Sequence, residues 1–183
     1  MGNTTFATIL ANLSQSLGPV QSLLSGLAYL LGILFMMTAI SKLKKIGDAR
    51  TGSHSQEKMY APIAYFIISA LLIYLPTSVT ALSNTTFGTS NVLQYTPFNN
   101  TTVYGSMGII IQTAGLIWFI RGCVLIVHGS QPGPGAKEGR KGLLFLLAGV
   151  FAVNFQDTMG MLSSVINWLI SATNLSTLQN IST

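Results

Sequence analysis

Two charged side chains lie inside long apolar segments of this sequence, where an unpaired charge is unfavourable. Arg121 lies about two helical turns from the cytoplasmic end of its segment, and Asp157 lies near the middle of another, close to Asn154 and Gln156. An arginine at the centre of a membrane span costs about 2.5–3.5 kcal/mol on insertion scales. These residues suggest an intramembrane ion pair, a pore-facing charge, or an arginine that snorkels to lipid phosphates.

The two charges are not at the same predicted depth. At 1.5 Å rise per residue, Arg121 and Asp157 differ in depth by about 10 Å. A pair within one chain therefore requires staggered or broken helices, and a pair between subunits is an equal alternative. A proton relay is the weaker alternative, because no intramembrane histidine or second acid accompanies Asp157. We expect Asn154, Asp157 and Met161 to share a helix face that meets protein or water.

The sequence carries no motif for catalysis or for metal binding. His54 and His128 have no cysteine or acidic neighbours at ligand spacing. Ser-His-Asp, P-loop and dinucleotide-binding patterns are missing. We therefore predict a protein that is not an enzyme, with no catalytic, cofactor-binding or metal-binding residues and no cofactor.

The elements that position these side chains follow from composition. Of 183 residues, 49% are hydrophobic and only 7% are charged, where a soluble domain carries about 25% charged residues. Because so few charged residues cannot cover the surface of a protein in water, we expect the apolar side chains to face lipid. The single cysteine, Cys123, lies inside an apolar segment.

Four apolar segments approach the roughly 20 residues that a membrane-spanning helix needs, at about 17–40, 59–82, 104–127 and 142–170. These segments are continuously apolar and lack the alternating pattern of barrel strands. Pro76 should kink or end the helix of the second segment. The predicted fold is an all-α membrane protein with four transmembrane helices in two helix–basic loop–helix hairpins, preceded by a short amphipathic interfacial helix. The single domain 1–183 divides into interfacial helix 1–16, first hairpin 17–83, outer loop 84–103, second hairpin 104–171 and tail 172–183.

The basic residues predict the orientation. Segments 41–58 and 128–141 hold eight of the nine Lys and Arg residues, while segments 1–16, 83–103 and 171–183 carry no charge. Basic connectors stay on the cytoplasmic side, which places both termini on the other side. The cations that we expect to contact phospholipid or cargo are Lys42, Lys44, Lys45, Lys137, Arg140 and Lys141. A bound phospholipid is the one non-protein ligand that they suggest.

The two hairpins suggest an internal duplication. Residues 74–82 can be laid over 154–162, and the sequence SGLAY at 25–29 resembles AGLIW at 114–118. Both halves would have the same orientation, so this would be a parallel repeat and not the inverted repeat of many transporters. Short apolar matches also arise by chance.

The second span and its exit, YFIISALLIYLPTSVTALSNTTFGTSNVLQY at 65–95, resemble the IcmC/DotE proteins of type IVB secretion systems and the TraQ-type proteins of I-type conjugation systems. The segments FIRG at 119–122 and AVN at 152–154 fit the same pattern, so the resemblance covers about 26–162. It implies a bacterial inner-membrane subunit of a machine that exports effectors or DNA. It implies no catalytic residues.

Other functions remain open from the sequence. The layout resembles, twice over, the two-helix conjugative pilins, which implies a subunit of an extracellular filament with bound phospholipid. A small transporter or channel that uses Arg121 and Asp157 is a third hypothesis. The expected partners are membrane lipid and either further copies of the chain or other secretion or conjugation subunits, without direct sequence-specific binding of nucleic acid.

Overall fold

The computed structural model describes residues 6–51, 59–88, 103–131 and 136–181, and within these ranges the chain is helical with no strand. The predicted all-α fold is therefore confirmed there. Two single helices in this part are long and apolar enough to cross a membrane. If each of two bent helix pairs is counted as one further span, there are up to four spans. The helices are α1 (Phe6–Thr51), α2 (Tyr60–Ile73), α3 (Leu75–Phe87), α4 (Val103–Gly129), α5 (Ala136–Val153) and α6 (Phe155–Ile181).

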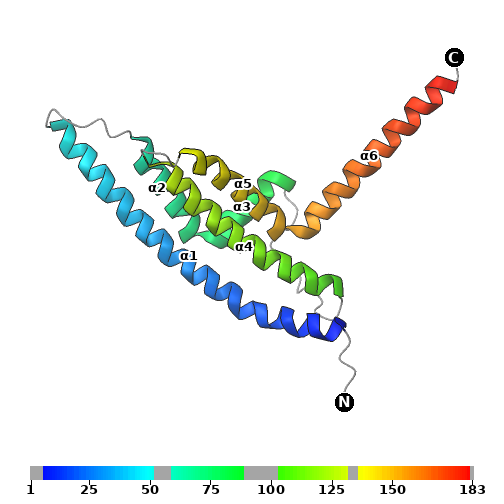
Figure 1. The fold of residues 1–183 in the computed structure, drawn as a ribbon, viewed down its shortest axis with the longest axis horizontal. Helices are drawn as coiled ribbons and strands as arrows, with labels where there is room; N and C mark the ends of the chain where they lie inside the picture. Colours follow the sequence, from blue (N-terminus) through cyan, green and yellow to red (C-terminus); the bar gives the residue numbers. More distant parts are fainter. Residues whose placement is uncertain (1–5, 52–58, 89–102, 132–135, 182–183) are drawn as a thin grey trace.

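Helix α1 is continuous over 46 residues, so among the described residues 6–16 are not a separate interfacial helix and no loop begins at residue 41. Pro19 lies inside the helix without ending it, and the lysines near its end continue it because lysine is a good helix former. Its length is about 69 Å at 1.5 Å per residue, more than twice the roughly 30 Å hydrocarbon core. Figure 1 shows the helix as one curved rod.

The other expected spans are broken. The chain turns by 100° between α2 and α3 and by 93° between α5 and α6. The first break was predicted from Pro76, which lies in the first turn of α3, where its missing N–H is not needed. The second, at Asn154, was not predicted, and the expectation of one regular helix over 142–170 is wrong. Helix α6 also continues to Ile181, through most of the predicted tail, whereas 89–102 of the predicted outer loop lie outside the described residues.

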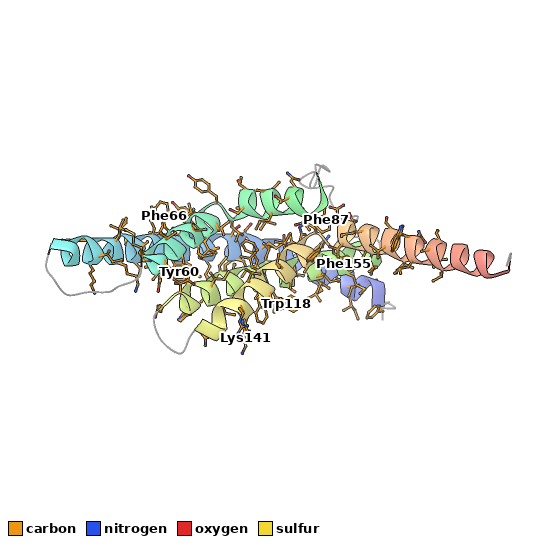
Figure 2. The ribbon with its side chains drawn as sticks, turned by 90° about the horizontal axis from the view of Figure 1, so that it is seen from above. Tyr60, Phe66, Phe87, Trp118, Lys141 and Phe155 are labelled. Atoms are coloured by element: carbon orange, nitrogen blue, oxygen red, sulfur yellow. The ribbon has the colours of Figure 1, made fainter. Side chains whose placement is uncertain are left out.

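The helices form two antiparallel hairpins that lie side by side. Helix α1 contacts α2, α4 contacts α5, and α1 contacts α4, which runs in the same direction (Figure 1). The buried core between them includes Leu72, Phe119 and Val150. Many large apolar side chains instead point outward, among them Phe66 and Trp118, which are about half exposed (Figure 2). An outward apolar surface is typical of helices that face lipid.

Glycines bring α4 and α5 into backbone contact. A Cβ atom added to Gly122 would lie 2.8 Å from the carbonyl oxygen of Gly142, and one added to Gly142 would lie 2.9 Å from that of Gly122. A Cβ on Gly115 would lie 2.7 Å from the backbone nitrogen of Val153. No larger side chain fits between these helices, which is how small residues serve helix pairs in membranes.

Candidate functional site

The charged side chains gather at one end of the paired hairpins. Figure 1 shows the last turns of α1 and α4 at the same end as the first turns of α2 and α5. This basic end carries exposed or half-exposed cations on α1 and α5: Lys42, Lys44, Lys45, Arg140 and Lys141. The side chain of Lys137 and all of 52–58 lie outside the described residues. Two cationic clusters distant in the sequence are thereby placed on one side of the molecule.

Tyr65 links three elements at this end. Its ring is only 4% exposed, and the Lys42 ammonium lies 5.4 Å from the ring centroid. The amide of Gln131, just beyond α4, donates a hydrogen bond to the Tyr65 hydroxyl at 2.5 Å. The ring of Phe35 on α1 packs edge-on against Tyr65 at 5.9 Å. One side chain thus fixes the exits of α1 and α4 relative to α2, and holds one of the cations in place.

Arg121 contacts an aromatic ring and not the acid that we considered as its partner. Its guanidinium lies 5.3 Å from the ring centroid of Phe145 on α5. Asp157 lies half-buried in the first turn of α6, beyond the break, where a carboxylate is favourable beside the free N–H groups. Since Gly115 and not Arg121 lies opposite Val153 at the break, the structure does not bring Arg121 and Asp157 together within the chain.

Asn154 forms the corner between α5 and α6. It is 7% exposed, and its side-chain amide donates to the carbonyl oxygen of Val150 at 2.8 Å. The Thr158 hydroxyl lies 2.8 Å from the carbonyl oxygens of both Asn154 and Phe151. The Thr158 hydroxyl therefore links the first turn of α6 to a carbonyl group in the last turn of α5.

The expected shared face of Asn154, Asp157 and Met161 is not formed. The break at Asn154 changes the direction of the helix by 93°, so Asn154 is buried while Met161 is half exposed. Gln156 is exposed. The face prediction is wrong because it assumed one helix through all three residues.

A polar contact between the two hairpins was not predicted. The Gln21 side-chain amide of α1 donates to the Thr113 hydroxyl of α4 at 2.9 Å, and Thr113 is 5% exposed. Glutamine and threonine within apolar segments were a signal that sequence reasoning passed over, as was the tyrosine at position 65. Such contacts between helices in lipid are worth about 0.6–2 kcal/mol.

No protein-family model, curated protein or solved structure matches this chain. The resemblance to IcmC/DotE and TraQ-type proteins therefore stays a prediction from the residues quoted above.

Proposed function

We propose that this chain is a non-enzymatic structural subunit of a type IVB-like secretion or conjugative DNA-transfer apparatus in the bacterial inner membrane. It acts by packing helices against other membrane helices, with its basic end in the cytoplasm and both termini in the periplasm. Two features together carry the structural role. Helices α4 and α5 form a pair packed through glycines, and many large apolar side chains of the molecule face outward.

The segregation of charge supports the proposed orientation. In the described residues, the charged side chains other than Arg121 and Asp157 lie at the basic end. Helices α2 and α5 have 14 and 18 residues, or about 21 and 27 Å, so α5 nearly matches the roughly 30 Å hydrocarbon core and α2 covers about two thirds of it. In the proposed arrangement both cross the membrane from the basic end, and the breaks at Tyr74 and Asn154 lie near its outer side.

The secretion assignment is supported by the sequence resemblance, whose most specific element is the apolar run that ends in Ile-Tyr-Leu-Pro. This element coincides with the first break, since α2 ends at Ile73 and α3 begins at Leu75. Because this Ile-Tyr-Leu-Pro pattern lies where the backbone turns, it supports the resemblance more strongly than similarity between apolar helices does.

A pilin-like subunit is the second candidate, favoured by α6. This helix projects from the paired hairpins (Figure 1) and exposes every residue from Met159 to Thr173, as a subunit of a polymer does before it meets its neighbour. The transporter hypothesis loses support, because Arg121 lies over Phe145 and away from Asp157.

Gene deletion with complementation tests the proposal. We expect deletion to abolish transfer of plasmid DNA or effector, and the natural chain to restore it. Gly122→Ile, which separates α4 from α5, should not restore transfer, whereas Gly26→Ala should, because no atom lies within 4 Å of a Cβ there. Undiminished transfer after deletion refutes the secretion assignment. Recovery of the chain in sheared surface filaments favours the pilin.

Thiol labelling tests the orientation separately. In a Cys123→Ser background, Ser171→Cys should react with a membrane-impermeant maleimide on intact cells after the outer membrane is permeabilised. Lys44→Cys should react only after the inner membrane is opened. The opposite pattern contradicts the proposed topology.

A further inference from the structure

The two halves of the molecule, α1–α3 and α4–α6, differ in how the helix after the break is packed. Helix α3 packs with one face against the rest of the molecule, where it contacts α1, α2 and α5. Val79 and Ser83 are buried, and the ring of Phe87 lies edge-on to Phe151 of α5 at 5.7 Å. Helix α6 contacts α4 and α5, and every one of its residues from Met159 to Thr173 is exposed.

The helices around the two breaks share one register at 80 residues. Helices α2 and α5 end at Ile73 and Val153, and α3 and α6 begin two residues later. Each of these last residues lies against a glycine of the preceding long helix, Gly32 or Gly115, whose added Cβ would approach the backbone nitrogen to 2.9 or 2.7 Å. These glycines are 83 residues apart, so the contact recurs although the long helices are offset by three residues from that register. The pairing of SGLAY with AGLIW was therefore misplaced, since Gly26 has no atom within 4 Å of an added Cβ.

Two aromatic side chains follow the same register. Tyr65 and Phe145 occupy equivalent places, and each ring lies beneath a cation from the preceding helix, Lys42 or Arg121, although these cations are 79 residues apart. The sequence Leu-Ser recurs at 82–83 and at 162–163. In α3 this serine is fully buried, whereas its counterpart in α6 is exposed.

The equivalence shows which contact α6 lacks. Helix α3 of the first half rests on α5, the second helix of the other half. The matching surface for α6 is an α2 helix, whose outer face exposes Ile63, Phe66 and Ile67 by more than half. The chain's own α6 points away from its α2 (Figure 1), so α6 does not reach this surface within one copy.

We propose that α6 of one copy packs on α2 of the next, with Asn167 beside Leu71, the positions equivalent to Phe87 and Phe151. The contact is head-to-tail: every copy offers one α6 and one α2, and the copies close into a ring or extend as a filament.

The side chains of α6 suit such a contact. Along one face, small and polar residues recur at helical spacing, and such residues let membrane helices approach closely: Gly160, Ser163, Ser164, Asn167 and Ser171. The hydroxyls of Ser163, Ser164 and Ser171 bond to carbonyl oxygens four residues earlier. They can therefore enter an apolar interface without an unsatisfied donor. The other side chains of α6 from Met159 to Ala172 are apolar and exposed, including Leu162, Trp168 and Leu169, and remain available to lipid.

Crosslinking between differently tagged copies tests the interface. Two single-cysteine chains, Leu71→Cys and Asn167→Cys in a Cys123→Ser background, are co-expressed and treated in native membranes with a short bifunctional thiol crosslinker. We expect a shift from monomer to a mixed dimer that carries both tags. A chain with both cysteines should give a ladder of multimers.

Matched controls make each outcome decisive. Phe87→Cys with Phe151→Cys in one chain should crosslink internally and report the native fold. Ile117→Cys, a half-exposed residue of α4, should not crosslink to Asn167→Cys. The proposal is overturned if the fold control succeeds and Leu71→Cys with Asn167→Cys stays monomeric, if Asn167→Cys alone dimerises through α6, or if Ile117→Cys crosslinks equally. The test needs no transfer assay, so it can fail or succeed independently of the proposed function.

Discussion

Tyr74 and Asn154 are equivalent corners, 80 residues apart, at which the chain turns by 100° and 93°. The N–H of each donates to the carbonyl four residues earlier at 3.1 Å, and the carbonyl of each accepts from the N–H four residues later, at 2.8 Å for Tyr74 and 2.9 Å for Asn154. Each residue thus ends one helix and begins the next with its own backbone groups satisfied. The breaks are formed features of the backbone and not frayed helix ends.

Thr158→Val should loosen the second corner. It removes the hydroxyl that lies 2.8 Å from the Phe151 carbonyl oxygen, and one lost hydrogen bond lowers the free energy of unfolding by about 1 kcal/mol. Spin labels at Leu144→Cys and Leu169→Cys, with Cys123→Ser, should report a longer and broader distance as α5 and α6 straighten. Thr158→Ser keeps the hydroxyl and should leave the distance unchanged. An unaltered distance in Thr158→Val means that the hydroxyl does not hold the corner.

Gly122→Ala should destabilise the α4–α5 pair. The new methyl would meet the backbone nitrogen of Leu146 at 2.6 Å, and overpacking of this kind costs about 1–3 kcal/mol. Thermal unfolding in detergent should show a lower midpoint for this variant. Gly26→Ala is the matched control, because its methyl enters open space and alanine favours the helix by up to about 1 kcal/mol. Equal midpoints for the two variants contradict the packing argument.

The sequence predicted the features that arise from local chemistry. Hydropathy predicted apolar helices, and Pro76 predicted the first break, because proline acts on its own helix. The corner at Asn154 could not be predicted in this way, because asparagine tolerates a helix and the corner depends on Thr158 and on contact with α4. The continuity of α1 was not predicted, because the basic residues at its end were assigned to a loop although lysine is a good helix former.

The candidate site was predicted only as a set of charges. Lys42 and Arg121 were noticed because charges are rare in this sequence, but their aromatic partners, Tyr65 and Phe145, look like ordinary apolar residues. A partner on another helix depends on the register between helices, which no local pattern specifies. The internal repeat contained that information, since the two rings are 80 residues apart, but it needed the structure to fix the alignment.

Tyr65→Phe should separate the hydroxyl contact of Tyr65 from the contacts of its ring. It removes the hydroxyl that accepts from Gln131 and keeps the ring beneath Lys42, so the free energy of unfolding should fall by about 0.5–1.5 kcal/mol. Tyr65→Leu should lose about 0.5–1 kcal/mol more, because the cation–π contact also disappears. Denaturation in detergent compares the variants, with Tyr60→Phe on the exposed start of α2 as the control. Tyr65→Phe as stable as the unaltered chain shows that the Gln131 contact is not formed in solution.

A double-mutant cycle should show which residue Arg121 interacts with. Its guanidinium lies over Phe145, so Arg121→Gln and Phe145→Leu should be coupled by about 0.5–1 kcal/mol. Arg121→Gln and Asp157→Asn should be additive, because Asp157 lies beyond the corner at Asn154 and sites without shared contacts add to within about 0.5 kcal/mol. The cycles are measured by unfolding in detergent, where the chain can be held monomeric, and repeated in lipid vesicles. Coupling to Asp157 that appears only in vesicles would identify an ion pair between copies, whereas coupling to Asp157 in the monomer contradicts the arrangement of α4 and α6 described above.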